Sequence, residues 1–114
     1  MTEKKVETYW CKIYMAGDIT QAKKLCREFV YDVPLCVNIV AMDYIYTGGE
    51  EAGFCVELIN YPRFPTTIQD LREKAKNLAD FLRRALYQHS YLIMDSQETV
   101  WNTVRKTDST NEAK

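Results

Sequence analysis

The sequence lacks the residue groupings that most catalytic and metal-binding motifs need. Its 114 residues include one histidine, His89, and four cysteines, none of them in a CxxC pair. A structural zinc site takes four closely spaced cysteine or histidine ligands, and the paired histidine motifs of two-histidine phosphoesterases need a second histidine. No Ser/His/Asp or Cys/His grouping can be proposed either. The sequence therefore predicts no metal, no cofactor, no catalytic residues and no enzymatic activity.

The chain also has no excess charge of one sign and no long apolar run. Lysine and arginine number 15 against 16 acidic residues, a net charge of −1. A protein that binds long nucleic acids usually carries a basic excess. The apolar runs are far shorter than the ~20 residues that span a bilayer, and residues 1–7 are too charged for a signal peptide. We expect a cytoplasmic protein with no membrane and no long nucleic acid as partner.

Length and polarity together predict a single domain with short tails. A chain of 114 residues holds one hydrophobic core. We expect a flexible N-terminus at residues 1–5, a single α+β domain at 6–105 and a disordered tail at 106–114, which lacks apolar residues. The four cysteines lie in apolar runs, where free cysteine behaves as a small buried hydrophobe.

Apolar periodicity divides residues 6–105 into strands and helices. Period-two alternation predicts strands at 6–15, 35–46, 54–61, 91–94 and 99–105. Apolar stripes at helical spacing predict helices over 19–30 and 68–86, each preceded by capping residues. A glycine-rich acidic turn at 47–53 joins the second and third strands. The order β-α-β-β-α-β with an extra C-terminal strand predicts a ferredoxin-like two-layer sandwich.

One face of the predicted sheet is left without helices. Each helix has a single apolar stripe, so both suit the same face of an antiparallel sheet. Large side chains such as Trp10, Tyr14, Tyr44 and Tyr46 are divided between the two faces, so several remain outside in either register. An exposed apolar surface of this kind usually marks a partner interface. We therefore expect a homo-oligomer, a dimer or larger.

The acidic turn is not a phosphate-binding loop. A P-loop joins a strand to a helix and carries a lysine, whereas this turn joins two strands and carries Glu50 and Glu51. These glutamates either form a solvated hairpin tip or accept hydrogen bonds from sugar hydroxyls, base amines or a partner's arginines.

The segment that follows the third strand is a stronger candidate for ligand contact. Pro62 and Pro65 stiffen it and hold Tyr61, Arg63 and Phe64. A guanidinium binds phosphate with paired hydrogen bonds, and aromatic rings stack on bases. The alternative is a plain strand-to-helix connection whose aromatic residues cap the core.

Further candidates lie in the C-terminal part of the chain. Trp101 and Arg105 share a face of the last strand, and His89 follows the second helix, where it either caps the helix or donates to a phosphate or ribose. Arg27 reaches the same ligand only through tertiary or subunit contacts. The expected ligand contacts are Arg27, Tyr61, Arg63, Phe64, His89, Ser90, Trp101 and Arg105.

The segments YTGGEEAG…LINYPRFP, CREF at 26–29 and YQHS at 87–90 are similar to small phage proteins. In size and in these segments the chain resembles the Thoeris anti-defence proteins, which sequester host immune signals. The resemblance implies a non-enzymatic sponge in the host cytoplasm: an oligomer that binds a cyclic ADP-ribose isomer or a cyclic oligonucleotide between subunits without cleaving it. The alternative is a protein–protein inhibitor that docks on a host enzyme through its acidic hairpin and exposed aromatic residues. A nucleotide-modifying enzyme ranks third.

Overall fold

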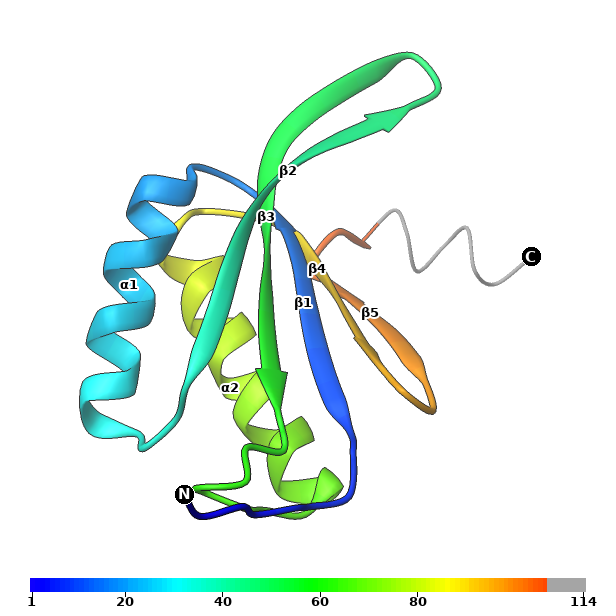
Figure 1. Ribbon diagram of the computed structural model, residues 1–114. Coiled ribbons are helices and arrows are strands. Elements are labelled where there is room, and N and C mark those ends of the chain that lie inside the picture. The colour runs from blue at the N-terminus through cyan, green and yellow to red at the C-terminus, as the bar shows by residue number, and fades with distance from the viewer. Residues whose placement is uncertain (107–114) are drawn as a thin grey trace.

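The computed structural model describes residues 1–106, so the predicted tail lies outside the described residues apart from Lys106. Residues 1–106 form five strands and two helices, whose arrangement Figure 1 shows. They are β1 (Trp10–Ala16), α1 (Ile19–Asp32), β2 (Val37–Tyr46), β3 (Gly49–Ile59), α2 (Ile68–Ala85), β4 (Ser90–Asp95) and β5 (Thr99–Thr103). This confirms the predicted element order, including the extra C-terminal strand.

The strands form one antiparallel sheet in the order β2-β3-β1-β4-β5. Both helices lie on the same side of this sheet, as Figure 1 shows. The chain is therefore the two-layer α+β sandwich that the periodicity predicts. Its sheet is one strand wider than the four-stranded ferredoxin-like sheet, because β5 pairs with the outer edge of β4.

The hydrophobic core fills the space between the sheet and the helices. Every second residue of β1, starting at Cys11, is buried there, and α2 contributes five buried residues against two from α1. The expectation that all cysteines are buried is wrong for Cys36, which is exposed just before β2. No helix within residues 1–106 has the length and apolar character needed to cross a membrane.

Local chemistry explains where the helices begin. The Asp18 carboxylate accepts a hydrogen bond from the Gln21 N–H at 3.2 Å, and the Thr67 hydroxyl accepts one from the Asp70 N–H at 3.0 Å. Both are N-caps that satisfy a first-turn donor. The first strand begins later than predicted, at Trp10, since residues 6–9 run past the end of β3.

The strands β2 and β3 continue beyond the sheet as a two-stranded arm (Figure 1). The last residue pair between β1 and β3 is Ala16 with Gly53. Beyond it, residues 43–46 of β2 pair with residues 49–52 of β3, and the Gly17 N–H, just after β1, donates to the Ala52 carbonyl. The predicted loop at 47–53 is wrong in extent, because only Thr47 and Gly48 form the turn. A two-residue turn is the commonest hairpin connection, and it makes the acidic residues part of β3.

Candidate functional site

The face of the sheet opposite the helices carries many large side chains that no helix or strand within residues 1–106 covers. Among them, Val40, Tyr46, Ile59 and Trp101 each expose between 43% and 53% of their surface. The pairing registers place these residues on the same face as Tyr14. The structure thus leaves large apolar groups on the uncovered face, as the sequence predicts, while the homo-oligomer that would cover them stays a prediction.

An open hollow of about 270 Å³ lies on this face near the base of the arm. We call it the aromatic hollow. Its side chains come from all five strands: Tyr14 and Ala16 of β1, Tyr44 and Tyr46 of β2, Glu51 of β3, Ser90 and Leu92 of β4, and Trp101 of β5.

The sheet register explains why these residues meet. Leu92 pairs with Tyr14 on one side and with Trp101 on the other, so the three side chains form a row across β1, β4 and β5. On the arm, Tyr44 pairs directly with Glu51. Directly opposed residues on antiparallel strands point to the same face. The row and the arm therefore line one hollow.

A hydrogen bond links two polar groups of the hollow, the Tyr46 hydroxyl and the Glu51 carboxylate. The Tyr46 hydroxyl donates to Glu51 Oε1 at 3.2 Å, and this bond raises the pKa of Tyr46. The positive charge of Arg105 acts in the opposite direction on the same pKa. Burial raises the pKa of Tyr44 to about 12. Both tyrosines are therefore protonated hydrogen-bond donors at neutral pH.

This arrangement suits a ligand that combines a flat base with a positive charge. Aromatic rings stack on nucleobases, and their faces attract cations. The exposed Glu51 carboxylate adds a negative charge beside them. Two exposed groups of opposite sign act on the Tyr46 hydroxyl: Glu51 accepts its hydrogen bond, and the charge of Arg105 lowers its pKa. The hollow can bind and orient such a ligand by stacking and by charge.

The structure brings together four of the predicted contact residues. Ser90 and Trp101 line the aromatic hollow. Arg105 lies just beyond β5, where its N–H donates to the Thr103 hydroxyl at 3.1 Å. The exposed His89 precedes β4, and its carbonyl accepts a hydrogen bond from the Val104 N–H at 2.9 Å. These residues therefore gather at one end of the β4–β5 pair.

The other four predicted residues lie elsewhere in the chain. Tyr61 and Phe64 pack with ring centroids 5.9 Å apart beyond the end of β3, and the Arg63 guanidinium lies 5.6 Å from the Phe64 ring centroid. This loop lies beside the opposite end of β1 from the hollow, roughly 20 Å away at ~3.3 Å per strand residue. Arg27 borders a separate groove between α1 and β2. Ligand binding by these four stays a prediction.

Several residues of the hollow are absent from the predicted contact set. Tyr14, Tyr44 and Tyr46 are recognised in the sequence only as large side chains for a partner interface, and Glu51 only as part of a hairpin tip. The signal that links them is the period-two spacing of Tyr44 and Tyr46, combined with a short turn that sets Glu51 opposite Tyr44.

No protein-family model matches the chain, and no curated protein sequence matches it. Solved structures that share its fold include two of a phage SAM lyase. One is a phage SAM lyase in the apo state, with a TM-score of 0.72 and 16% identity, covering 92% of this chain and 97% of the other. The second is a phage SAM lyase in complex with S-methyl-5′-thioadenosine, with a TM-score of 0.68 and 15% identity, covering 91% of this chain and 95% of the other.

These comparisons overturn the sponge function predicted from the sequence. Both structures are of an enzyme, and one holds a product-like nucleoside, S-methyl-5′-thioadenosine. The predicted non-enzymatic sequestration of a cyclic nucleotide, its inhibitor alternative and the predicted lack of enzymatic activity are therefore wrong. The phage origin of both structures agrees with the coarser part of the resemblance, while nothing in them supports a sponge family.

Proposed function

We propose that this chain is a lyase that cleaves SAM (S-adenosylmethionine) and releases S-methyl-5′-thioadenosine. The aromatic hollow carries this proposal, because SAM combines an adenine base with a sulfonium cation. Trp101 and the tyrosines offer stacking surfaces for the base, and Glu51 offers a negative charge for the cation. The fold shared with the phage SAM lyases over more than nine-tenths of the chain supports the same assignment.

The chemistry needs little from the protein beyond orientation. When the bond between sulfur and the γ-carbon of the amino-acid end breaks, its electron pair returns to sulfur and S-methyl-5′-thioadenosine leaves as a neutral thioether. In the same step the γ-carbon bonds to the substrate's own carboxylate oxygen, giving a lactone, or the adjacent carbon loses a proton to a base, giving an alkene. The lactone route fits this hollow better, because the substrate supplies its own nucleophile and the protein needs only to hold the reacting atoms in line.

Exclusion of water favours the lactone route further. The carboxylate and the sulfonium neutralise each other as the reaction proceeds, so a dry apolar site favours the transition state over the charged ground state. The hollow is open to solvent on its outer side, where the exposed Trp101 and Tyr46 lie. We propose that a second copy of the chain covers this face, which completes the site and buries the apolar side chains.

We also propose that β1 to β4 with both helices form a ferredoxin-like unit to which β5 is an addition. The support is the strand order: β3 lies between β1 and β2, and β1 lies between β3 and β4. Each helix then connects two strands that are separated by one other strand, as in the split βαβ arrangement.

Turnover of SAM by the purified chain tests the lyase function. We expect S-methyl-5′-thioadenosine to accumulate well above a protein-free blank, measured by liquid chromatography with mass spectrometry. Glu51→Gln and Trp101→Ala should each lower kcat/KM about tenfold or more, as expected for a lost charge or stacking contact. Tyr31→Ala, on the exposed surface of α1, is the matched control and should leave kcat/KM unchanged. SAM that stays at the blank level with folded wild-type protein would contradict the function.

A further inference from the structure

The backbone beyond β5 is anchored beside the aromatic hollow. Ser90 pairs with Thr103 in the sheet, and the Ser90 hydroxyl donates to the Thr103 hydroxyl oxygen at 2.8 Å. The Val104 N–H donates to the His89 carbonyl at 2.9 Å, and the Arg105 N–H donates to the Thr103 hydroxyl oxygen at 3.1 Å. Since Ser90 itself lines the hollow, these bonds fix the start of the Arg105 side chain at its rim.

The rim therefore carries charges of both signs from two different elements. Glu51 comes from the arm, where it accepts the hydrogen bond of Tyr46. Arg105 comes from the end of β5, and its positive charge lowers the pKa of the same tyrosine against the effect of Glu51. The Arg105 backbone is held at the Ser90 end of the hollow, so the side chain starts beside the space where a ligand would lie. Its side chain is exposed and can pair with an incoming anion.

We propose that Arg105 determines specificity for the amino-acid end of the substrate by binding its α-carboxylate, while Glu51 receives the cationic groups. This inference rests on the proposed SAM lyase function. SAM carries one carboxylate and two cationic groups at this end, which matches one guanidinium and one carboxylate at the rim. A guanidinium binds a carboxylate with two parallel hydrogen bonds, so it selects a planar anion in a defined orientation. In the lactone route, this contact also orients the oxygen that attacks the γ-carbon.

Two uncleavable ligands separate the carboxylate contact from binding of the nucleoside. Sinefungin keeps the nucleoside, the amino-acid end and a positive charge, whereas S-methyl-5′-thioadenosine lacks the amino-acid end. We expect Arg105→Gln to weaken sinefungin binding about tenfold to a hundredfold, the range of a charge-assisted hydrogen-bond pair. Its affinity for S-methyl-5′-thioadenosine should stay within about twofold, because that ligand makes no carboxylate contact. Isothermal titration calorimetry measures both constants.

Two further variants sharpen the result. Arg105→Lys keeps the charge but not the planar fork, so it should recover part of the sinefungin affinity. Arg84→Gln removes an exposed arginine at the end of α2 and should change neither constant. If Arg105→Gln lowers the affinity for both ligands equally, Arg105 shapes the hollow in general. If it lowers neither affinity, Arg105 takes no part in binding. Each of these results overturns the inference. Wild-type protein that binds neither ligand would instead overturn the proposed function itself, and this inference with it.

Discussion

At the scale of single residues, Gly53 lets the Tyr44 ring, which lines the aromatic hollow, pack directly against β3. The Tyr44 ring lies across this glycine, and the Tyr44 hydroxyl donates to the Phe54 carbonyl at 2.5 Å. A Cβ atom at position 53 would lie 2.4 Å from both the Met15 carbonyl oxygen and the Tyr44 ring. Glycine is therefore required here by close approach of the neighbouring strand and ring, and not by an unusual backbone angle.

Gly53→Ala tests this requirement. The new methyl group meets backbone on one side, which cannot move away, so we expect a loss of about 2 kcal/mol in the free energy of unfolding. Gly49→Ala is the matched control on the same strand, since its Cβ would meet only the exposed Tyr46 side chain, at 3.0 Å. Its loss should stay below about 1 kcal/mol. Urea unfolding followed by circular dichroism measures both values, and equal losses would contradict the close-approach explanation.

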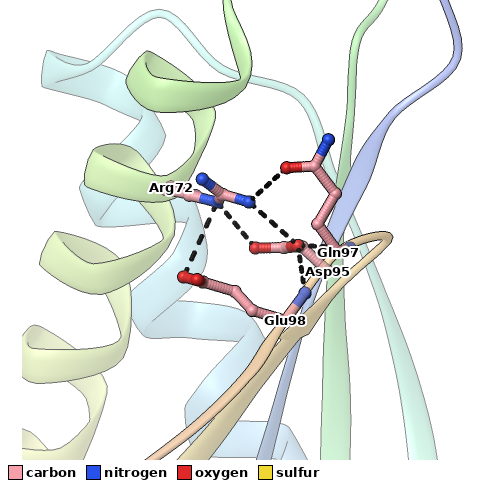
Figure 2. Close-up of polar contacts among 4 residues, drawn as sticks. All are labelled: Arg72, Asp95, Gln97 and Glu98. Atoms are coloured by element: carbon pink, nitrogen blue, oxygen red, sulfur yellow. Dashed lines mark hydrogen bonds and ion pairs between the residues drawn. The ribbon is translucent and has the colours of Figure 1, made fainter.

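At the scale of elements, an ion pair joins α2 to the turn between β4 and β5, as Figure 2 shows. The Arg72 Nε–H donates to Asp95 at 2.8 Å, and its terminal nitrogen donates to Gln97 Oε1 at 2.9 Å. Asp95 also accepts hydrogen bonds from the backbone N–H groups of Gln97 and Glu98. The Asp95 side chain is only 3% exposed, so its charge depends on these partners.

Loss of the Asp95 charge should destabilise the fold in a pH-dependent way. The Arg72 guanidinium, followed by the two N–H groups, lowers the pKa of Asp95 in the folded chain. A carboxylate of this kind stabilises the fold at pH values above its unfolded pKa of about 4, and this contribution disappears as the pH falls through the folded value. We therefore expect wild-type stability to decline below about pH 4.

The variant Asp95→Asn isolates this contribution. It should lower the free energy of unfolding by about 2–3 kcal/mol at pH 7, because Arg72 loses its buried, charged partner. The difference from wild type should narrow below about pH 4, where Asp95 becomes protonated first in the unfolded chain and, at lower pH, in the folded chain. Asp43→Asn, on the exposed part of the arm, is the control and should stay within about 0.5 kcal/mol. Urea unfolding at several pH values gives the comparison, and a difference that is constant with pH would argue against the ion pair.

The sequence predicts the elements well because their signals are local. Asp18 caps α1 as expected, and the apolar stripe of the second helix matches Ile68–Ala85. The hollow is not predictable in this way, because it depends on strand order and register. A turn of two residues instead of the expected loop moves Glu51 from the hairpin tip to a position opposite Tyr44. Both loop lengths satisfy the glycine signal, so the sequence alone does not choose between them.

At the scale of the whole molecule, the two sides of the sheet have different tasks. One side supplies the core with both helices, and the other presents the aromatic hollow and apolar side chains such as Val40 and Ile59. The chain shares its fold with the phage SAM lyase at only 16% identity. This is consistent with such a division, because many different apolar residues of suitable size can fill the same core. The proposed site lies on the uncovered side, so whether a second copy covers this side in solution bears directly on the proposed function.

The proposed homo-oligomer predicts how charges on the uncovered side change the assembly. Wild-type protein should have a mass above the 13.4 kDa of one chain by native mass spectrometry and light scattering. Val40→Asp and Ile59→Asp place a charge where each side chain is now 46% and 43% exposed, so both should shift the mass toward one chain while the circular dichroism spectrum is kept. Tyr31→Asp puts the same charge on the helix side, at an 89% exposed residue, and should leave the mass unchanged. Because the proposed second copy would cover the hollow, the proposed lyase activity should fall together with the mass for Val40→Asp and Ile59→Asp, and not for Tyr31→Asp. Wild-type protein that stays a single chain at all concentrations, yet turns over SAM, would show that one chain forms the complete site.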